Sequence, residues 1–77
     1  MAMSRKDYIK FAEALGTIKG IELTHSNSED AYAITNTLTS VTSYIGSIFE
    51  ADNPNFDWDR FESAIEKEFE ETLERMP

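Results

Sequence analysis

Apolar residues recur every three or four positions along three stretches of the chain, which is the spacing of one side of an α-helix. Polar segments containing glycine or proline separate the three stretches. The pattern predicts an all-α fold, a compact three-helix domain with helices at about residues 5–18, 28–51 and 58–75. Residues 1–77 are expected to form a single helical domain, because so short a chain supports only one small core.

The first predicted helix begins after Ser4, whose hydroxyl is a typical N-cap, and Asp7 supplies the acid of a shortened capping box. Gly16 and Gly20 are both candidates for its C-terminal end, since glycine readily takes the left-handed conformation that closes a helix. We expect the helix to end near residue 18 and the segment GIELTHSNS, which starts at Gly20, to be a loop.

The middle stretch combines two conflicting signals. Seven of the fifteen residues in TNTLTSVTSYIGSIF are β-branched, which favours a strand. A two-residue period, however, places Ile34 and Val41 on opposite faces, whereas a helical period gathers the whole apolar series on one side. We therefore predict a helix, capped by Asn27 or Ser28. Its apolar stripe is Ala31, Ile34, Leu38, Val41, Ile45 and Ile48.

The segment DNPNF separates the second and third predicted helices. Pro54 disfavours helix at the residue before it, so the second helix should stop around residues 51–52. Asp57 is the expected N-cap of the third helix. Phe56 and Phe61 have the spacing of a hydrophobic staple, in which the residue before the cap packs against the first turn.

The predicted core combines the apolar sides of all three helices. Full burial of one such side chain contributes about 1.5–3 kcal/mol, and ordering the chain costs a similar total. Because a domain of this size is marginally stable, leftover apolar surface favours self-association into a homo-oligomer. The expected core residues are Phe11, Leu15, Ile34, Leu38, Val41, Ile45, Phe56, Phe61, Ile65 and Phe69.

The net charge of −8 is unevenly distributed along the chain. Residues 1–20 carry four basic and two acidic side chains, whereas residues 52–77 carry nine acidic and three basic ones. Phosphates repel such a chain, so we expect no direct binding to nucleic acid and favour a protein partner with a basic surface. No segment approaches a membrane span, and the N-terminus lacks the apolar stretch of a signal peptide, so we expect a cytoplasmic protein that does not contact membranes.

Candidate chemistry is sparse. The chain has no cysteine and a single histidine, His25, so it cannot supply the nitrogen and sulfur ligands of a zinc site. The acidic segment DNPNFDWDRFES is not a calcium loop, because Pro54 occupies the third position counted from Asp52 and the required glycine is absent. Phosphate-loop, dinucleotide and serine-triad patterns are also missing. We therefore expect a non-enzymatic protein with no catalytic residue, cofactor or metal ion.

Two segments carry a resemblance to a known group of proteins. The N-terminal SRKDYIKFAEAL and the C-terminal ADNPNFDWDRFESA resemble small uncharacterised proteins of phages and prophages, which have an RKDY-type first helix and a DNPxFDxxRF segment. The resemblance implies an origin in a mobile element, and with it interference with a host system in the host cytoplasm. It implies no activity and no site residue. The matching positions are Arg5, Lys6, Asp7 and Tyr8, then Asn53, Pro54, Phe56, Asp57, Arg60 and Phe61.

Hydroxyl side chains are concentrated in the middle of the chain, where ten Ser and Thr residues lie between Thr24 and Ser47. They form either a recognition face or a polar helix face whose hydroxyls bond back to the preceding turn, and we favour the second interpretation.

The third helix carries a run of glutamates away from its apolar side. These glutamates either keep the protein soluble or dock on a basic groove of a partner, where they imitate nucleic-acid phosphates. The leading hypothesis is an acidic, non-enzymatic protein-interaction module of phage type. Its most specific version is an inhibitor of a host defence or nucleic-acid-handling complex. The alternative is a structural or regulatory helical homo-oligomer without an inhibitory role. The residues expected to bind the partner are Glu62, Glu66, Glu70, Glu71 and Glu74, and no basic residue interrupts the row formed by Glu66, Glu70 and Glu74.

Overall fold

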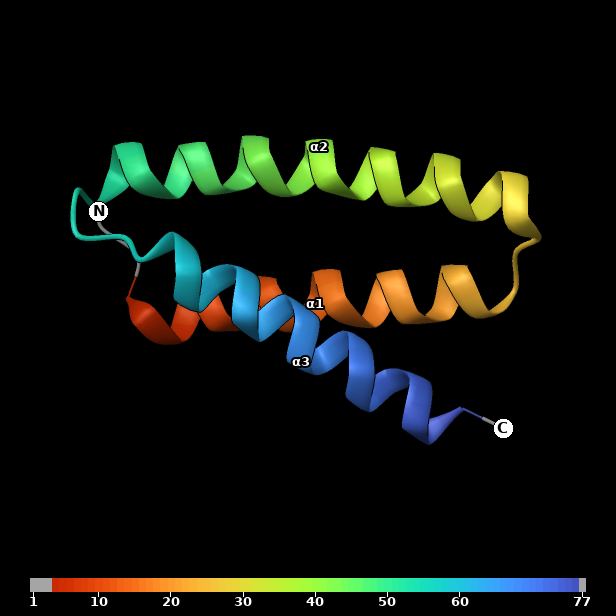
Figure 1. Ribbon diagram of the computed structural model, residues 1–77. Helices are drawn as coiled ribbons and strands as arrows, with labels where there is room; N and C mark the ends of the chain where they lie inside the picture. Colours follow the sequence, from red (N-terminus) through yellow and green to blue (C-terminus); the bar gives the residue numbers. More distant parts are fainter. Residues whose placement is uncertain (1–3, 77) are drawn as a thin grey trace.

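Three α-helices make up the fold in the computed structural model, which describes residues 4–76 (Figure 1). They are α1 (Arg5–Thr24), α2 (Ser28–Asp52) and α3 (Trp58–Arg75), and no strand occurs between residues 4 and 76. α1 and α2 run antiparallel to each other, and α3 crosses α1 at an angle. α3 packs mainly against α1, so α1 is the central helix of the domain. The predicted all-α, three-helix fold is confirmed.

Side-chain caps fix the start of each helix. The Ser4 hydroxyl accepts a hydrogen bond from the Asp7 N–H at 3.4 Å, and the Asp7 carboxylate accepts one from the Ser4 N–H at 3.0 Å, which completes the predicted capping box. Hydrogen bonds from the Ser4 backbone and side chain lower the pKa of Asp7. Asn27, rather than Ser28, caps α2, and Asp57 caps α3 as expected.

The predicted end of the first helix is wrong, because α1 continues through Gly16 and Gly20 to Thr24 and leaves only a short connection to α2. Neither glycine has a positive φ, so neither closes the helix. Both instead lie where α3 approaches most closely. A Cβ atom added to Gly16 would lie 2.8 Å from Glu68 Cβ and 2.9 Å from Phe69 N. Gly16 therefore lets the backbones of α1 and α3 touch, and Gly20 makes room for the Thr72 side chain.

Aromatic rings form the centre of the core, where α1, the end of α2 and the start of α3 meet. The ring centroid of Phe49 lies 4.8 Å from that of Tyr8, 5.7 Å from that of Phe56 and 5.6 Å from that of Phe61. Phe56 and Phe61 lie 5.4 Å apart in the geometry of the predicted staple. The complete buried core is Tyr8, Ala12, Leu15, Phe49, Phe56, Phe61 and Ile65.

The core prediction is correct in part. Leu15, Phe56, Phe61 and Ile65 are buried, but Phe11 is 46% exposed. In α2 the predicted stripe is only partly covered, and its last member, Ile48, is 64% exposed while its neighbour Phe49 is buried. An apolar repeat of 3.5 residues drifts by about 20° per heptad around a straight helix of 3.6 residues per turn. The end of the stripe, with Val41 and Ile48, therefore rotates out of the core. Ile34, Leu38, Ile45 and Phe69 are half-buried.

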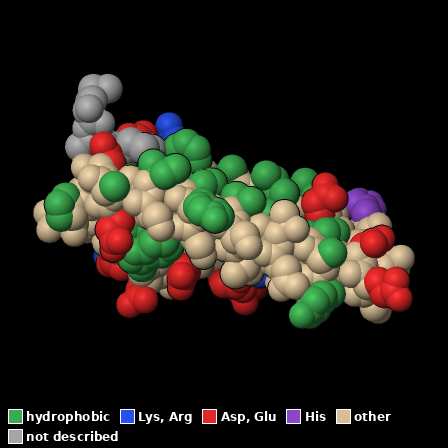
Figure 2. Space-filling view, turned by 90° about the horizontal axis from the view of Figure 1, so that it is seen from above, with side chains coloured by type: hydrophobic (Ala, Val, Ile, Leu, Met, Phe, Trp, Pro, Cys, Tyr) green, Lys and Arg blue, Asp and Glu red, His purple; other side chains and the backbone are tan. Residues whose placement is uncertain are grey.

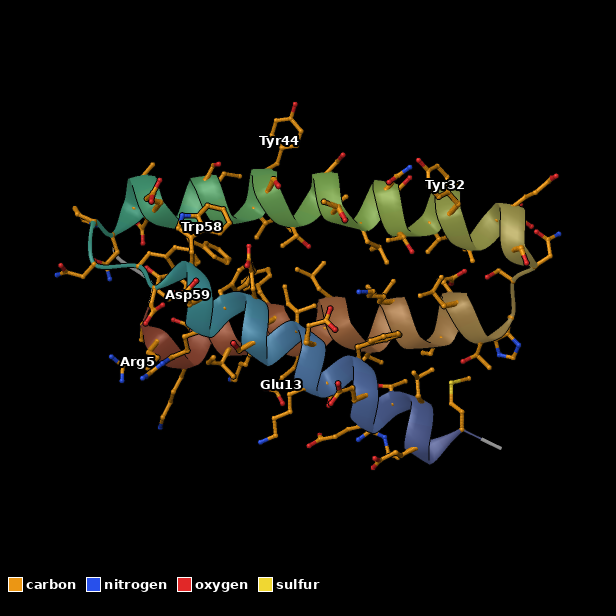
Figure 3. The ribbon with its side chains drawn as sticks, in the orientation of Figure 1. Arg5, Glu13, Tyr32, Tyr44, Trp58 and Asp59 are labelled. Atoms are coloured by element: carbon orange, nitrogen blue, oxygen red, sulfur yellow. The ribbon has the colours of Figure 1, made fainter. Side chains whose placement is uncertain are left out.

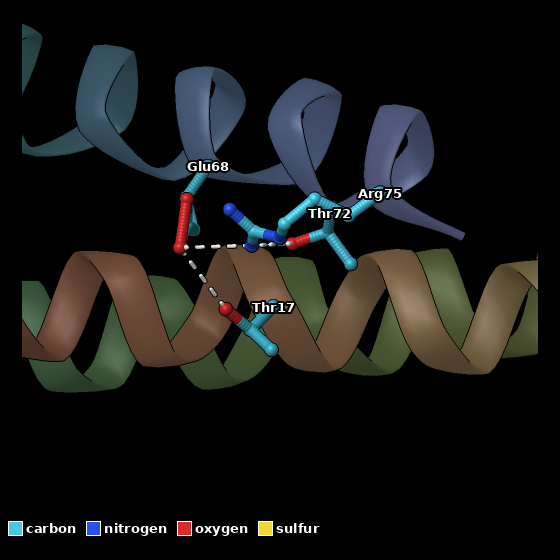
Figure 4. Close-up of polar contacts among 4 residues, drawn as sticks. All are labelled: Thr17, Glu68, Thr72 and Arg75. Carbon is cyan, nitrogen blue, oxygen red and sulfur yellow. Dashed lines mark hydrogen bonds and ion pairs between the residues drawn. The ribbon is translucent and has the colours of Figure 1, made fainter.

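A polar network ties the second half of α3 to α1 (Figure 4). The Thr17 hydroxyl donates to Glu68 Oε1 at 3.4 Å, and an Arg75 guanidinium nitrogen lies 3.3 Å from the same oxygen. The same Arg75 nitrogen donates to the Thr72 hydroxyl at 3.1 Å. Glu68 is thereby held within the α1–α3 contact and differs from the exposed glutamates of this helix.

Trp58 joins the start of α3 to the end of α2 (Figure 3). Its indole N–H donates to Glu50 Oε2 at 2.9 Å, and its ring lies against Gly46, where any Cβ atom would overlap it. The far end of α2 has no equivalent contact with α3, so the two helices diverge along their length.

We expect Gly16→Ala to lower the thermal midpoint. Helix propensity alone favours alanine by about 0.5–1 kcal/mol, but the close backbone of α3 makes this an overpacking substitution that costs about 1–3 kcal/mol. Gly20→Ala should cost less, because the nearest atoms there belong to the Thr72 side chain rather than to the backbone. Thermal unfolding followed by circular dichroism measures both effects. Higher midpoints for both variants would contradict the close α1–α3 contact.

Candidate functional site

An open groove of about 240 Å³ lies between α2 and α3, where the two helices diverge over α1. Its apolar floor has one residue from each helix: Leu15 of α1, Leu38 of α2 and Ile65 of α3. We call this feature the α2/α3 groove. The other residues that line it are Lys19, Thr35, Thr39, Thr42, Ser43, Glu62 and Glu66.

The α3 wall of the groove contains two of the predicted partner-binding residues, Glu62 and Glu66, and both are exposed. Lys19 reaches across from α1, with its ammonium 2.9 Å from Glu66 Oε1 and 4.6 Å from the centroid of the Phe69 ring. Although no basic residue interrupts the row in the sequence, Lys19 partly neutralises it at Glu66. Glu62 has no such ion pair among residues 4–76.

The remaining predicted residues lie further around α3. Glu70 and Glu74 continue the row at four-residue spacing and are exposed. Glu71 is half-buried and lines a different hollow, together with Glu13 of α1 and Lys67. The five glutamates therefore do not form one surface: four follow one row, and Glu71 lies on the other side of the helix.

The α2 wall of the groove is made of hydroxyl groups. The Thr39 hydroxyl donates to the Thr35 carbonyl at 2.8 Å, and the Ser47 hydroxyl donates to the Ser43 carbonyl at 2.8 Å, as the favoured interpretation of the Ser/Thr stretch predicted. The hydroxyls of Thr42 and Ser43 make no hydrogen bond within the described range and remain available in the groove. Sequence reasoning missed their position because it did not predict that α3 would lie opposite.

A second surface is apolar, and three of its five residues, Phe11, Ile34 and Val41, were predicted to belong to the core. Ile34, Val41 and Ile48 follow one another at seven-residue steps along one side of α2, and Phe11 and Ile18 do so along one side of α1. Ile18 and Ile34 line the same shallow hollow, so the two rows adjoin. We call these five residues the apolar face. Figure 2, which looks onto α2, shows hydrophobic side chains gathered along one edge and acidic side chains along the other edge and at both ends.

The two segments that carry the phage-type resemblance lie side by side in the structure. Tyr8 and Phe56 have ring centroids 5.0 Å apart, and both line a hollow that also contains Arg5, Asn53 and Arg60. The Tyr8 hydroxyl is buried and has no hydrogen-bond partner in the described part of the chain. These segments therefore build one packing unit that contains an unsatisfied polar atom.

Metal-binding and membrane-spanning features are absent from residues 4–76. No group of three or more His, Asp or Glu side chains in this range is arranged to hold a metal ion. None of the three helices is long and apolar enough to cross a membrane.

Comparison with known proteins gives no match: no family model, no curated protein and no solved structure is similar to this chain. The site must therefore be interpreted from its own geometry and chemistry.

We expect Tyr8→Phe to raise the stability of the domain. A buried hydroxyl without a partner costs about 1–3 kcal/mol, and phenylalanine keeps the ring contacts with Phe49 and Phe56. A gain of about 1 kcal/mol raises the midpoint of a domain of this size by roughly 4–8 °C. Thermal unfolding at fixed protein concentration measures the change. A lower midpoint would show that the hydroxyl has a partner, such as an ordered water.

Proposed function

We propose that this protein is a non-enzymatic, acidic protein-interaction module of phage type that docks on the basic surface of a host protein. The observation that carries the proposal is the α2/α3 groove, in which an apolar floor lies between an acidic wall and a hydroxyl wall. The proposed role is inhibition of a host defence or nucleic-acid-handling complex, since the partners of phosphate backbones present basic surfaces.

The groove suits a helix or extended segment that carries Lys or Arg side chains. The aliphatic stems of these residues pack on apolar surface while their charged ends stay in a polar environment. Leu15, Leu38 and Ile65 supply the apolar surface, and Glu62 supplies a carboxylate at the edge. The hydroxyl of Thr42 is available to accept a hydrogen bond from the incoming charged group.

Lys19 illustrates this mode of binding within the protein itself. Its ammonium lies between the Glu66 carboxylate and the face of the Phe69 ring. A basic residue of the partner would meet similar chemistry beside it, at Glu62 on one side and Glu70 on the other, because these residues are one helical turn from Glu66.

The charge density of α3 favours a protein partner surface over close imitation of a nucleic acid. α3 carries seven acidic and three basic residues, a net charge of −4. Its 18 residues span about 27 Å, so it presents one net charge per roughly 7 Å. A DNA duplex presents about one charge per 1.7 Å. The acidic row of α3 therefore attracts a basic surface, and we assign the selection of a particular partner to the α2/α3 groove.

A second candidate function is a structural or regulatory helical homo-oligomer without an inhibitory role, which the exposed apolar face favours. A pull-down from bacterial lysate at low and high salt separates the two candidates. Recovery of a basic protein that is released by salt supports the docking module. Recovery of the protein alone supports the homo-oligomer.

We expect the double variant Glu62→Gln/Glu70→Gln to bind a basic partner more weakly while remaining folded. Both residues are exposed and the variant leaves the Lys19–Glu66 ion pair intact, so stability should change by no more than about 0.5 kcal/mol. A labelled amphipathic peptide with lysines on one side and leucines on the other serves as the probe. Fluorescence anisotropy at two salt concentrations should show severalfold weaker binding and a flatter salt dependence.

The matched control is Glu13→Gln/Glu71→Gln, which removes the same charge from the hollow on the other side of α3. It should retain most of the affinity, with a small loss from the lower net charge. Equal losses of peptide affinity in the two variants would contradict docking at the groove and would mean that Glu71 also contributes to binding. Unchanged affinity in both would mean that the glutamates serve only solubility.

A further inference from the structure

We propose that the apolar face joins two copies of this protein in an antiparallel pair related by a two-fold axis. The face is continuous across α1 and α2, and α3 leaves it uncovered. On α1, Ile18 lies about 160° and Phe11 about 140° around the helix from Gly16 in the same direction, and Gly16 is the residue that α3 covers. The Phe49 ring of α2 contacts Phe11 from one side, with 5.3 Å between the ring centroids, but Phe11 and Ile18 each remain 46% exposed.

The size of the face suits a pair of copies. From Ile34 to Ile48 it extends about 20 Å along α2 and is two helices, or roughly 20 Å, wide. The footprint is therefore about 400 Å² per copy, and residues that border the face must add to it to reach the roughly 800 Å² per partner that stable dimers bury. A patch of this size is among the largest that monomeric proteins expose, and such patches are often functional.

The charge distribution identifies the occupant as a second copy. α2 has no charged residue between Ala31 and Phe49. Two molecules of net charge −8 can therefore meet across this neutral surface, with the acidic row of each α3 turned away. A partner with a basic surface gains nothing at the apolar face and is attracted to the opposite side of the molecule.

The ends of the face specify the antiparallel direction. Lys10 lies one residue before Phe11 and about 100° around α1 from it, so it flanks one end of the apolar row and reaches the face through its long side chain. Glu22 lines the hollow beside Ile18 at the other end. In an antiparallel pair, Lys10 of each copy approaches Glu22 of the other copy, and the protruding Phe11 ring approaches the hollow at Ile18 and Ile34. A parallel pair would bring the two Glu22 carboxylates together, which is repulsive.

The pairing has a consequence for partner binding that adds to the proposed function but does not depend on it. Each copy keeps its α2/α3 groove open, because the groove lies on the α3 side of the helices. A pair therefore presents two grooves on opposite sides, and a partner with two basic sites would be bound with avidity.

Two exposed tyrosines on α2 provide a matched test. Tyr44 is 76% exposed and lies one turn from Ile48, at the edge of the apolar face. Tyr32 is 74% exposed and lies about 160° around the helix from Ile48 (Figure 3). Sedimentation equilibrium of the unaltered protein should give about twice the 8.8 kDa chain mass. Tyr44→Asp and Ile48→Asp should shift the mass toward 8.8 kDa, and Tyr32→Asp should not. Circular dichroism checks that each variant remains helical.

A charge exchange tests the antiparallel direction. Lys10→Glu and Glu22→Lys should each weaken the pair severalfold, and the double exchange should restore it. Lys10 also lies near Asp7, so the helicity of the Lys10→Glu variant is measured in parallel. A protein that stays monomeric at its highest soluble concentration would overturn the proposal. Equal effects of the two tyrosine variants would also overturn it, and a double exchange that fails to restore pairing would overturn the antiparallel arrangement.

Discussion

The arrangement of the three helices depends on the close contact between α1 and α3 at Gly16 and Gly20. The backbone of α3 lies directly against Gly16, and the Thr72 side chain lies against Gly20. The Glu68 network then fixes the far end of the contact. α2 has no comparable contact with α3 beyond the aromatic cluster and Trp58, which stacks on Gly46. As a result α2 and α3 meet at one end and diverge at the other. The same asymmetry opens the groove on one side of α2 and leaves the apolar face uncovered on the other.

The features that could be predicted from the sequence are those that depend on neighbouring residues. The caps at Ser4 and Asp57 and the staple of Phe56 on Phe61 each involve residues within one or two turns, and the structure contains all of them. The helical state of α2 was also predictable, because periodicity outweighed the strand preference of its β-branched residues. The end of α1 was not predictable in this way. Glycine can end a helix or allow a second helix to approach, and only the presence of α3 decides between the two.

Of the α2/α3 groove, only the acidic wall formed by α3 could be predicted from the sequence. The spacing of Glu62, Glu66, Glu70 and Glu74 places them in a row, which the structure retains. What lies opposite that row depends on how far α2 and α3 diverge, and no local pattern contains this information. The sequence therefore could not place Thr42 across the groove from Glu62, bring Lys19 to Glu66, or separate Glu71 from the others. The apolar face was hidden for a related reason. Val41 and Ile48 fit a heptad repeat that predicts burial, and the drift of a straight helix turns them outward.

The segregation of charge on this small domain resolves the conflict between solubility and exposed apolar surface. A domain of 77 residues cannot bury all of its large apolar side chains, so some must face outward or meet another molecule. Here Phe11, Ile18, Val41 and Ile48 lie together on one side of α1 and α2, while α3 carries seven of the fifteen acidic residues. The electrostatic repulsion between copies then acts mainly on one side of the molecule and leaves the other side able to associate. Because the groove and the apolar face lie on opposite sides of α2, the two proposed contacts can form at the same time, and substitutions away from Leu38, which lines both hollows, can test them separately.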